Sequence, residues 1–384
     1  MKIVIAPDSY KESLTALEVA TEIEAGFREV FPDADYIKLP MADGGEGTVA
    51  AMVAATGGTL VEVEVTGPLG EKVTAYYGLT GDGKTAIIEM AAASGLALVA
   101  PALRNPMNTT SYGTGELIRA ALHAGINHLI NGIGGSATND GGAGMLQALG
   151  VALLDGAGLE IGFGGGQLAH LDRIDIRTMD PRLRQCRIEA ACDVTNPLTG
   201  SRGASAVFGP QKGATPEMVA QLDANLCRYA GLISRDLGVQ VELVPGAGAA
   251  GGMGAALLAF LGAQLRPGID IVMEAVGLEE YVKDADLVIT GEGCIDSQTI
   301  NGKTPIGVAR MAKRFGKPVI GIAGCLAGDA AVVHSHGIDA VFSVLSQTCT
   351  VDEALTNAAV NVRIASRNIA ATLKFAGEMQ KGLL

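Results

Sequence analysis

The sequence predicts an α/β protein: a doubly wound parallel sheet of Rossmann-like type, with a second α/β domain inserted that contains an antiparallel meander. Strand-like and helix-like segments alternate near both ends of the chain, which is typical of a parallel sheet covered by helices on both faces. Three short β-rich runs between residues 59 and 90 are joined by turn signals, which predicts the meander. The 384 residues are enough for two domains.

Each element follows from the periodicity of the apolar residues. The N-terminal part predicts a strand at 2–6, a helix at about 13–31, a strand at 36–39 and a helix at about 46–56. The C-terminal part predicts a helix at 269–285, a strand at 286–290, a helix at 306–316, strands at 318–324 and 339–345, and a long helix from about 352. We therefore expect a discontinuous Rossmann-like domain at 1–58 and 262–384, an inserted domain at 59–261, and an active site in the cleft between them.

Composition and charge narrow the possible functions. The formal net charge is −13 without a run of basic residues, which disfavours nucleic acid as a partner because such binding needs clustered Lys and Arg. No apolar run is long enough to cross a membrane. Six cysteines without C-x-x-C pairs indicate reduced thiols and a cytoplasmic location, and five histidines without metal-ligand spacing disfavour zinc.

Residues 78–85 read GLTGDGKT and match the phosphate-loop pattern G-x-x-x-x-G-K-[ST]. A working phosphate loop needs a helix that begins at this point, because the free N–H groups of its first turn bind the phosphates. Asp82-Gly83 is instead a strong hairpin signal, and apolar residues alternate on both sides of it. We therefore interpret this stretch as a hairpin turn and not as an ATP site.

Five other stretches share one design, in which an apolar strand is followed by a glycine-containing polar loop and then by a helix. Ligands bind at the carboxyl ends of the strands in an open parallel sheet, so these loops are expected to converge. The first, APDSYKES, carries Asp8, Ser9 and Lys11. Lys11 could receive a phosphate or carboxylate, and Asp8 could orient a hydroxyl or magnesium. The alternative is that Ser13 caps the helix and Lys11 is solvated.

The second stretch is MADGGEGT, which follows the second predicted strand. Asp43 and Glu46 are spaced like the two residues of a capping box, so the alternative to a binding role is that they cap the following helix. Gly44, Gly45 and the third glycine that follows are more glycines than a helix cap needs. Close approach of the backbone to a ligand explains the excess.

The third stretch is GIGGSATNDGGAG, in which a strand leads into a long glycine-rich loop and a helix follows from about Ala143. Successive backbone N–H groups, two hydroxyls and a helix N-terminus lie together here, which favours a phosphate or anion site over a plain connection. Its candidate binding residues are Gly134, Gly135, Ser136, Thr138, Asn139 and Asp140.

The fourth stretch is ACDVTNPL with the following FGPQKGA. Asp193 comes directly after an apolar run and Asn196 follows it, a pair suited to hydrogen-bonding a small polyol or a metal. Lys212 is the cation of the FGPQKGA loop. The alternative to a binding role is that it is an ordinary surface lysine. The sequence thus predicts polar groups at the end of one more strand.

The fifth stretch, VITGEGCIDSQTINGKT, carries Gly291, Glu292 and Asp296 at the end of a predicted strand, with Lys303 at the start of the next helix. A further motif, Gly246, Gly248 and Gly251 in PGAGAAGGMG, satisfies G-x-G-x-x-G and taken alone favours a dinucleotide-binding dehydrogenase. Pro245 at its turn and the helical spacing of the segment downstream argue against that interpretation.

Taken together, APDSYKESL, ADGGEGT, GIGGSATNDGGAG, ACDVTNPL, FGPQKGA, PGAGAAGGMG and LVITGEGCIDSQT occur in an order that resembles the class I glycerate kinases of bacteria. The similarity runs over essentially the whole chain. It implies phosphorylation of D-glycerate by ATP with Mg²⁺, in a cleft between a Rossmann-like and a second α/β domain. Members of this type resemble 2-kinases that make 2-phosphoglycerate in glyoxylate or aldarate breakdown.

Phosphoryl transfer needs positioning, neutralisation of phosphate charge and a carboxylate that accepts the proton of the attacking hydroxyl. We expect Asp193 to be that carboxylate and Lys11 to be a second catalytic residue. Lys11, Lys212 and the loop 134–142 would receive the anions. Asp43, Glu292 or Asp296 could hold magnesium.

Two other classes of function fit the same residues. One is an NAD-dependent dehydrogenase of a small hydroxy acid, and the other is a non-catalytic sugar-acid sensor. Within the kinase class, phosphorylation at O3 of glycerate is the alternative to O2, because C2 and C3 are adjacent. The sequence leaves the oligomeric state open.

Overall fold

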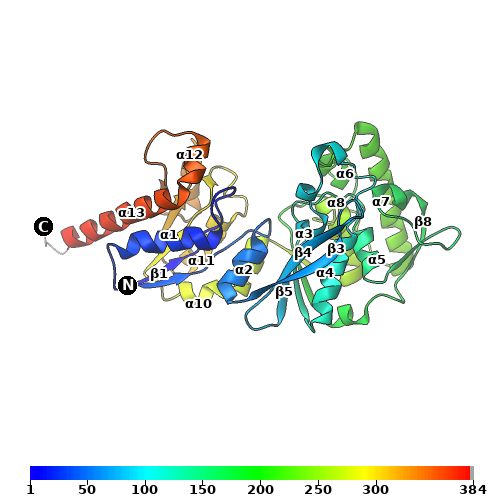
Figure 1. The fold of residues 1–384 in the computed structure, drawn as a ribbon, viewed down its shortest axis with the longest axis horizontal. Helices are drawn as coiled ribbons and strands as arrows, with labels where there is room; N and C mark the ends of the chain where they lie inside the picture. Colours follow the sequence, from blue (N-terminus) through cyan, green and yellow to red (C-terminus); the bar gives the residue numbers. More distant parts are fainter. Residues whose placement is uncertain (381–384) are drawn as a thin grey trace. The chain divides into compact units, whose positions relative to one another are not determined.

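The computed structural model describes residues 1–380, and the chain divides into two compact units (Figure 1). The smaller unit consists of three segments, which are Met1–Asp43, Ala50–Thr56 and the chain from Ile269 onward. The larger unit consists of Gly44–Val49 and Gly57–Gly268. A short loop after the second strand therefore belongs to the larger unit although its neighbours in sequence belong to the smaller one.

The smaller unit is built on a five-stranded parallel sheet with the order β15-β13-β11-β1-β2. Its strands are β1 (Lys2–Ile5), β2 (Asp35–Lys38), β11 (Leu287–Thr290), β13 (Val319–Ala323) and β15 (Ala340–Ser343). β1 lies between β2 and β11, with Ile3 opposite Tyr36 on one side and Leu287 on the other. The predicted parallel sheet built from both ends of the chain is confirmed.

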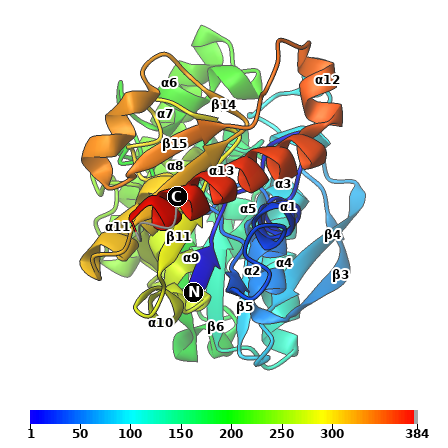
Figure 2. The ribbon, with the colours of Figure 1, turned by 90° about the vertical axis from the view of Figure 1, so that its left-hand side faces the viewer.

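Helices cover both faces of this sheet. Ile3 and Ile5 share a core with residues of α1 and α13, and Val4, which points to the opposite face, is also fully buried. α1 and α13 lie side by side (Figures 1 and 2), and the contact is close because Gly26 has no side chain: a Cβ there would lie 2.4 Å from the Arg363 carbonyl oxygen. The helices of this unit are α1 (Ala16–Arg28), most of α2 (Thr48–Thr56), α9 (Gly268–Ala275), α10 (Leu278–Val282), α11 (Thr304–Arg314), η6 (Ala330–His336), α12 (Val351–Thr356) and α13 (Ala358–Gln380).

Two local expectations in this unit are wrong. The cap of α1 is Thr15 and not Ser13: Thr15 forms a capping box with Glu18, and the Ser13 hydroxyl donates to the Leu355 carbonyl instead. The single helix expected at 269–285 is two helices, α9 and α10, because Gly277 adopts a left-handed φ of 67° between them.

The larger unit is built on a six-stranded mixed sheet with the order β10-β9-β6-β5-β4-β3. β3 pairs with β4 and β4 with β5 in antiparallel fashion, which confirms the predicted meander, while β5, β6, β9 and β10 are parallel. The strands are β3 (Thr59–Thr66), β4 (Lys72–Leu79), β5 (Thr85–Glu89), β6 (His128–Gly132), β9 (Arg187–Ala191) and β10 (Gln264–Arg266).

Smaller elements complete the two units. The larger unit contains the helices α3 (Ala91–Ser94), α4 (Tyr112–His123), α5 (Ala143–Ala148), α6 (Ala204–Phe208), α7 (Pro216–Leu237) and α8 (Ala249–Leu261), and the short helices η1 (Leu96–Leu98), η2 (Pro101–Leu103), η3 (Gly165–His170), η4 (Pro181–Gln185) and η5 (Pro210–Lys212). Two strand pairs lie outside the main sheets, namely β7 (Ala152–Asp155) with β8 (Leu171–Asp175), and β12 (Cys294–Ile295) with β14 (Cys325–Leu326). Across residues 1–380, no helix combines the length and the apolar character that crossing a membrane requires.

The GLTGDGKT stretch forms the turn between β4 and β5, as the Asp-Gly signal predicts. Gly83 donates to the Thr80 carbonyl at 2.8 Å, and Thr80 donates to the Thr85 carbonyl at 3.1 Å. Gly83 has φ +67°, a conformation that favours glycine. Lys84 is followed by a strand and not by a helix, so this turn offers no helix N-terminus to a phosphate.

Candidate active site

The first and fifth loops meet at the carboxyl edge of the smaller sheet. From β1 the chain passes to β2 on one side, whereas β11, β13 and β15 extend the sheet on the other side. Ligand sites of open parallel sheets lie where the strand order reverses in this way. The loops that follow β1 and β11 are in contact there, because the Asp8 N–H donates to the Gly291 carbonyl at 2.8 Å.

Asp8 is the most strongly constrained carboxylate of this edge. Its Oδ1 accepts from the Ser9 N–H at 2.6 Å, and its Oδ2 accepts from the Thr304 hydroxyl at 2.6 Å. Burial raises the pKa of Asp8 to about 6 against the effect of the Thr304 bond, and the charges of Asp43 and Glu292 raise it further. A carboxyl group that titrates near neutral pH at a strand end is a candidate for chemistry.

Glu292 and Asp296 share a neighbouring cation. The Lys303 Nζ lies 3.3 Å from a Glu292 carboxylate oxygen and 3.9 Å from one of Asp296. Thr299 donates its hydroxyl to Glu292 at 2.5 Å, and burial raises the Glu292 pKa although Thr299 and Lys303 act in the opposite direction. The sequence signal for Thr299 and for Thr304 was weak, because isolated threonines in a loop are common.

The acidic side chains of this edge fit a magnesium ion only in part. Among residues 1–380, no three or more His, Cys, Asp or Glu side chains are arranged to hold a metal ion. Mg²⁺, however, usually takes one or two protein carboxylates and completes its shell with water and substrate phosphates. Asp43, Glu292 and Asp296 supply suitable oxygen donors. Lys11 is exposed next to them, and a Cβ on Gly293 would lie 3.6 Å from its backbone nitrogen.

The second loop lies on the carboxyl edge of the larger sheet. A Cβ on Gly44 would lie 2.4 Å from the Cβ of Ala191, the last residue of β9. A Cβ on Gly132, the last residue of β6, would lie 2.8 Å from the Gly44 carbonyl oxygen, and one on Gly134 would lie 3.6 Å from the Gly45 Cα. The second and third loops are therefore in contact, and their glycines permit it.

A residue that the sequence analysis missed holds the second loop in place. Glu89, the last residue of β5, is buried, and its carboxylate accepts from the Val49 N–H at 2.7 Å and from the N–H groups of Gly47 and Thr48. These N–H groups lie at the start of α2, where a helix offers them no carbonyl partner of its own. The cap of α2 is thus Glu89 and not the nearby Asp43–Glu46 pair. Its signal was a carboxylate at the end of a predicted strand.

The third loop is held from within by Asp140. The buried Asp140 carboxylate accepts from the Ser111 N–H at 2.9 Å, the Ser111 hydroxyl at 2.7 Å, the Gly142 N–H at 3.1 Å and the Gly144 N–H at 3.2 Å. These bonds tie the starts of α4 and α5 together. Asp140 thus anchors the loop, while Gly134 and Gly135 remain exposed at the strand end.

Lys212 is not a surface lysine. It is 2% exposed, and its Nζ donates to the Ser136 hydroxyl at 2.7 Å and to the Thr138 carbonyl at 2.6 Å. Burial lowers the Lys212 pKa to about 7, and the negative charge of Asp140 opposes this shift. The Lys212 ammonium has three donors, of which these bonds use two.

Two buried polar atoms beside Lys212 have unused hydrogen-bonding capacity. Thr138 Oγ1 and Asn139 Oδ1 are buried and make no hydrogen bond within residues 1–380, whereas the Asn139 amide donates to Ser205 at 2.9 Å. Buried polar atoms without a partner are uncommon and call for an explanation, such as a bound water or ligand. The third and fourth loops therefore supply one cation and two free polar atoms to the same place.

Asp193 and Asn196 have different surroundings. Asp193 is exposed two residues after β9, and its Oδ1 accepts from the Gly268 N–H at 3.2 Å. The Asn196 amide donates to the Arg202 carbonyl at 2.8 Å, and its own carbonyl accepts from Gly246 and Gly248. Asn196 therefore organises the PGAGAAGG segment. Residues 238–248 form no strand, whereas the dinucleotide fingerprint requires a strand directly before its glycines.

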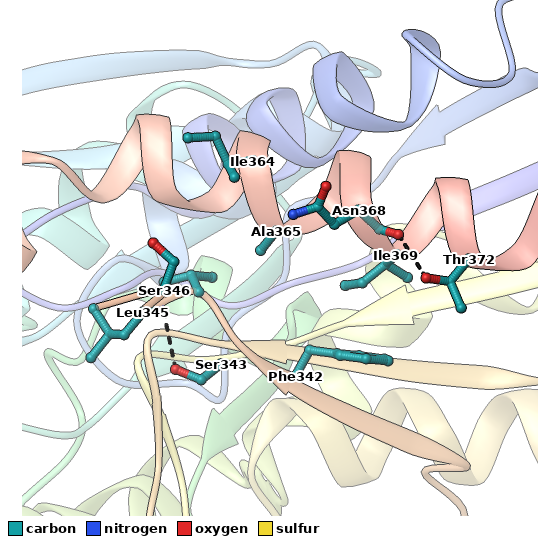
Figure 3. A pocket seen from close by; sticks show the side chains of 10 residues that line it. Phe342, Ser343, Leu345, Ser346, Ile364, Ala365, Asn368, Ile369 and Thr372 are labelled. Atoms are coloured by element: carbon teal, nitrogen blue, oxygen red, sulfur yellow. Dashed lines mark hydrogen bonds between the residues drawn. The ribbon is translucent and has the colours of Figure 1, made fainter. Parts of the chain in front are cut away.

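A pocket of about 220 Å³ lies between β15 and α13 (Figure 3). Its lining includes Phe342, Leu345, Ile364 and Ile369 and contains no charged side chain. Binding of a phosphate-bearing substrate needs cations or N–H donors, so this pocket is a poor candidate for the active site.

Comparison with known proteins identifies the family. A model described as the glycerate kinase family matches residues 3–374 of the chain. The chain belongs to the glycerate kinase family. It is 65% identical over 373 residues to a protein of Escherichia coli (strain K12) named glycerate 2-kinase, a match that covers 97% of this chain and 98% of the relative. It is 63% identical to glycerate kinase of Haemophilus influenzae, with coverage of 98% and 99%.

The solved structures agree with this assignment. A crystal structure described as glycerate kinase 2 from Salmonella typhimurium LT2 superposes with a TM-score of 0.92 at 67% identity, covering 98% of this chain and 99% of that one. As a member of the glycerate kinase family, the protein is a phosphotransferase with an alcohol acceptor. The dehydrogenase alternative and the sensor alternative are thereby set aside.

We predict that Asp8→Asn stabilises the protein at pH 8 and not at pH 4. Because the folded pKa lies above that of the unfolded chain, ionising Asp8 costs stability as pH rises from about 4 to 6, and Asn removes this cost. The expected gain is about 1 kcal/mol after allowance for partial exposure. Thermal unfolding at both pH values measures it, with the exposed Asp172→Asn as control; equal gains at pH 4 and pH 8 would contradict the prediction.

Proposed function

We propose that this glycerate kinase family member transfers the γ-phosphoryl group of ATP to O2 of D-glycerate, in glyoxylate or aldarate breakdown. The observation that carries the proposal is the match over almost the full length to the E. coli relative, which is named glycerate 2-kinase. The six cysteines are all free thiols, which supports a cytoplasmic location.

Phosphorus NMR of the product tests the position of transfer. Proton-coupled spectra separate the two products, because a phosphate on O2 couples to the single proton on C2 and gives a doublet, whereas a phosphate on O3 couples to two protons and gives a triplet. We expect the doublet. A triplet would assign the activity to O3, and absence of ADP formation with D-glycerate would reject the kinase proposal altogether.

The acidic edge of the smaller sheet supports a role in receiving the magnesium-bound phosphates. When bound, Mg²⁺ would neutralise charge on the transferred group. Asp43, Glu292 and Asp296 would hold it, each with carboxylate oxygens of the kind this ion prefers. Lys303 and the exposed Lys11 would supply positive charge to the phosphate oxygens, with Lys11 in the catalytic role.

The buried edge of the larger sheet supports a role in binding an anion. Lys212, the free Thr138 and Asn139 atoms, and the backbone N–H groups of residues 134–142 are the donors and acceptors that a small hydroxy acid would need. Gly44 and Gly45 would border the same ligand, since they contact this loop. Asp193 would accept the proton of the attacking hydroxyl, because it is a carboxylate at a strand end and is exposed to solvent.

We predict that Asp193→Asn lowers kcat by about two to four orders of magnitude, because the amide cannot accept the hydroxyl proton. Folding should be unaffected, since Asn retains an oxygen for the Gly268 N–H. Steady-state kinetics and thermal unfolding check both statements, with the exposed Asp172→Asn as matched control. Turnover within a few-fold of the parent enzyme would remove Asp193 from the mechanism.

We predict that D-glycerate binding at pH 8 takes up close to one proton. Lys212 is mostly neutral at that pH, and a carboxylate placed beside it favours the charged form, so binding and protonation are linked. The uptake should shrink at pH 6, where Lys212 is already charged. Calorimetry in Hepes and in Tris measures the proton through the different ionisation heats of the two buffers.

Two substitutions show whether the proton uptake belongs to Lys212 or follows from the loss of any lysine. Lys212→Met should abolish both the proton uptake and tight glycerate binding. Lys84→Met, in the hairpin that mimics a phosphate loop, should change neither, and it should leave kcat and the KM for ATP within a few-fold. Binding at pH 8 without proton uptake would show that the glycerate anion does not lie beside Lys212.

A further inference from the structure

Two short strands of the smaller unit place two cysteines opposite each other. β12 and β14 pair in parallel, and their register sets Cys294 directly against Cys325. Backbone hydrogen bonds fix this register: Cys325 donates to the Gly293 carbonyl at 3.0 Å, and Ala327 donates to the Ile295 carbonyl at 3.0 Å. Both thiols are half-buried, and they hydrogen-bond to one another.

The spacing suits a covalent bond between the two sulfur atoms. Neighbouring strands of a sheet lie about 4.8 Å apart. A disulfide spans Cα atoms about 4.4 to 6.8 Å apart, so the strands need little movement to accept one. We propose that Cys294 and Cys325 are an oxidisable thiol pair that a peroxide converts to a disulfide, and that this disulfide reversibly stops turnover.

The chemistry uses both thiols and one peroxide molecule. Peroxide oxidises one cysteine sulfur to a sulfenic acid, and water leaves. The thiol of the other cysteine attacks that sulfur, an S–S bond forms, and the hydroxyl leaves with a proton as a second water. Two thiols are oxidised and one O–O bond is reduced, and a dithiol reductant reverses the change by exchange.

The other four cysteines lack this arrangement. The thiols of Cys186 and Cys192 are directed to backbone carbonyls, of Ile126 and Arg182 for Cys186 and of Val194 for Cys192. Cys227 and Cys349 are exposed. Exposure favours reaction of Cys227 and Cys349 with peroxide, whereas the facing positions of Cys294 and Cys325 favour a disulfide between these two.

The disulfide would act on the loop that carries Glu292 and Asp296, and this consequence rests on the proposed function. The Gly324 N–H donates to the Glu292 carbonyl at 3.2 Å, and a Cβ on Gly324 would lie 2.4 Å from the Gly293 carbonyl oxygen. The backbones already touch there. The small adjustment that brings the sulfurs to about 2.05 Å would fall on the loop that carries Glu292, and a displacement near 1 Å at a reacting centre costs about 10²-fold in rate.

Peroxide treatment of the full-length enzyme tests the proposal. After blocking of free thiols, mass spectrometry of an unreduced digest should find one cross-link, between the peptides that contain Cys294 and Cys325. kcat should fall about 100-fold and recover with dithiothreitol. Cys294→Ser/Cys325→Ser should keep its activity through the same treatment, whereas Cys227→Ser/Cys349→Ser should lose activity as the parent enzyme does.

Three outcomes would overturn the proposal. Free thiols at both positions after peroxide, or a cross-link to any other cysteine, would show that the pair is not a disulfide site. A cross-linked enzyme with full kcat would show that the disulfide is no switch. Because the cross-link is measured by mass, its failure is distinguishable from a failure of the proposed kinase activity, which is measured on the reduced enzyme.

Discussion

The direction of the parallel strands is the constraint on which this structure depends. Parallel strands all end at the same edge of their sheet, so the loops that follow them are brought together whatever their distance in sequence. Asp8 and Glu292, about three quarters of the chain apart, become neighbours because β1 pairs with β11. In the larger unit, the same rule gathers Gly44, Gly134 and Asp193 around the ends of β6 and β9.

Burial of polar groups at these edges determines their chemistry. Burial disfavours the charged form of a side chain, and hydrogen bonds oppose that effect. Four hydrogen bonds to Asp140 fix the starts of two helices. Lys212 and Asp8 are also hydrogen-bonded, and burial still lowers the pKa of Lys212 to about 7 and raises that of Asp8 to about 6. These are groups whose charge a ligand can change.

Local patterns predicted much of the fold and misjudged details of capping. The Asp82-Gly83 signal correctly outweighed a formal phosphate-loop match, because strand alternation on both sides contradicts a helix there. The cap of α2 could not be predicted, since it comes from Glu89, forty residues away in sequence and near only after β5 is in place. The break at Gly277 was missed because a single glycine is also tolerated within a helix.

The sequence by itself determined the fold class, the meander, the family and the loops that carry polar residues, because periodicity, turn residues and motif order are local properties. Only the tertiary structure decided which of these residues touch. It placed Asn196 and Asp140 among loop-anchoring contacts, buried Lys212 beside Ser136, and set Cys294 against Cys325. Those outcomes depend on strand order and register, which join residues far apart in the chain and which no local pattern specifies.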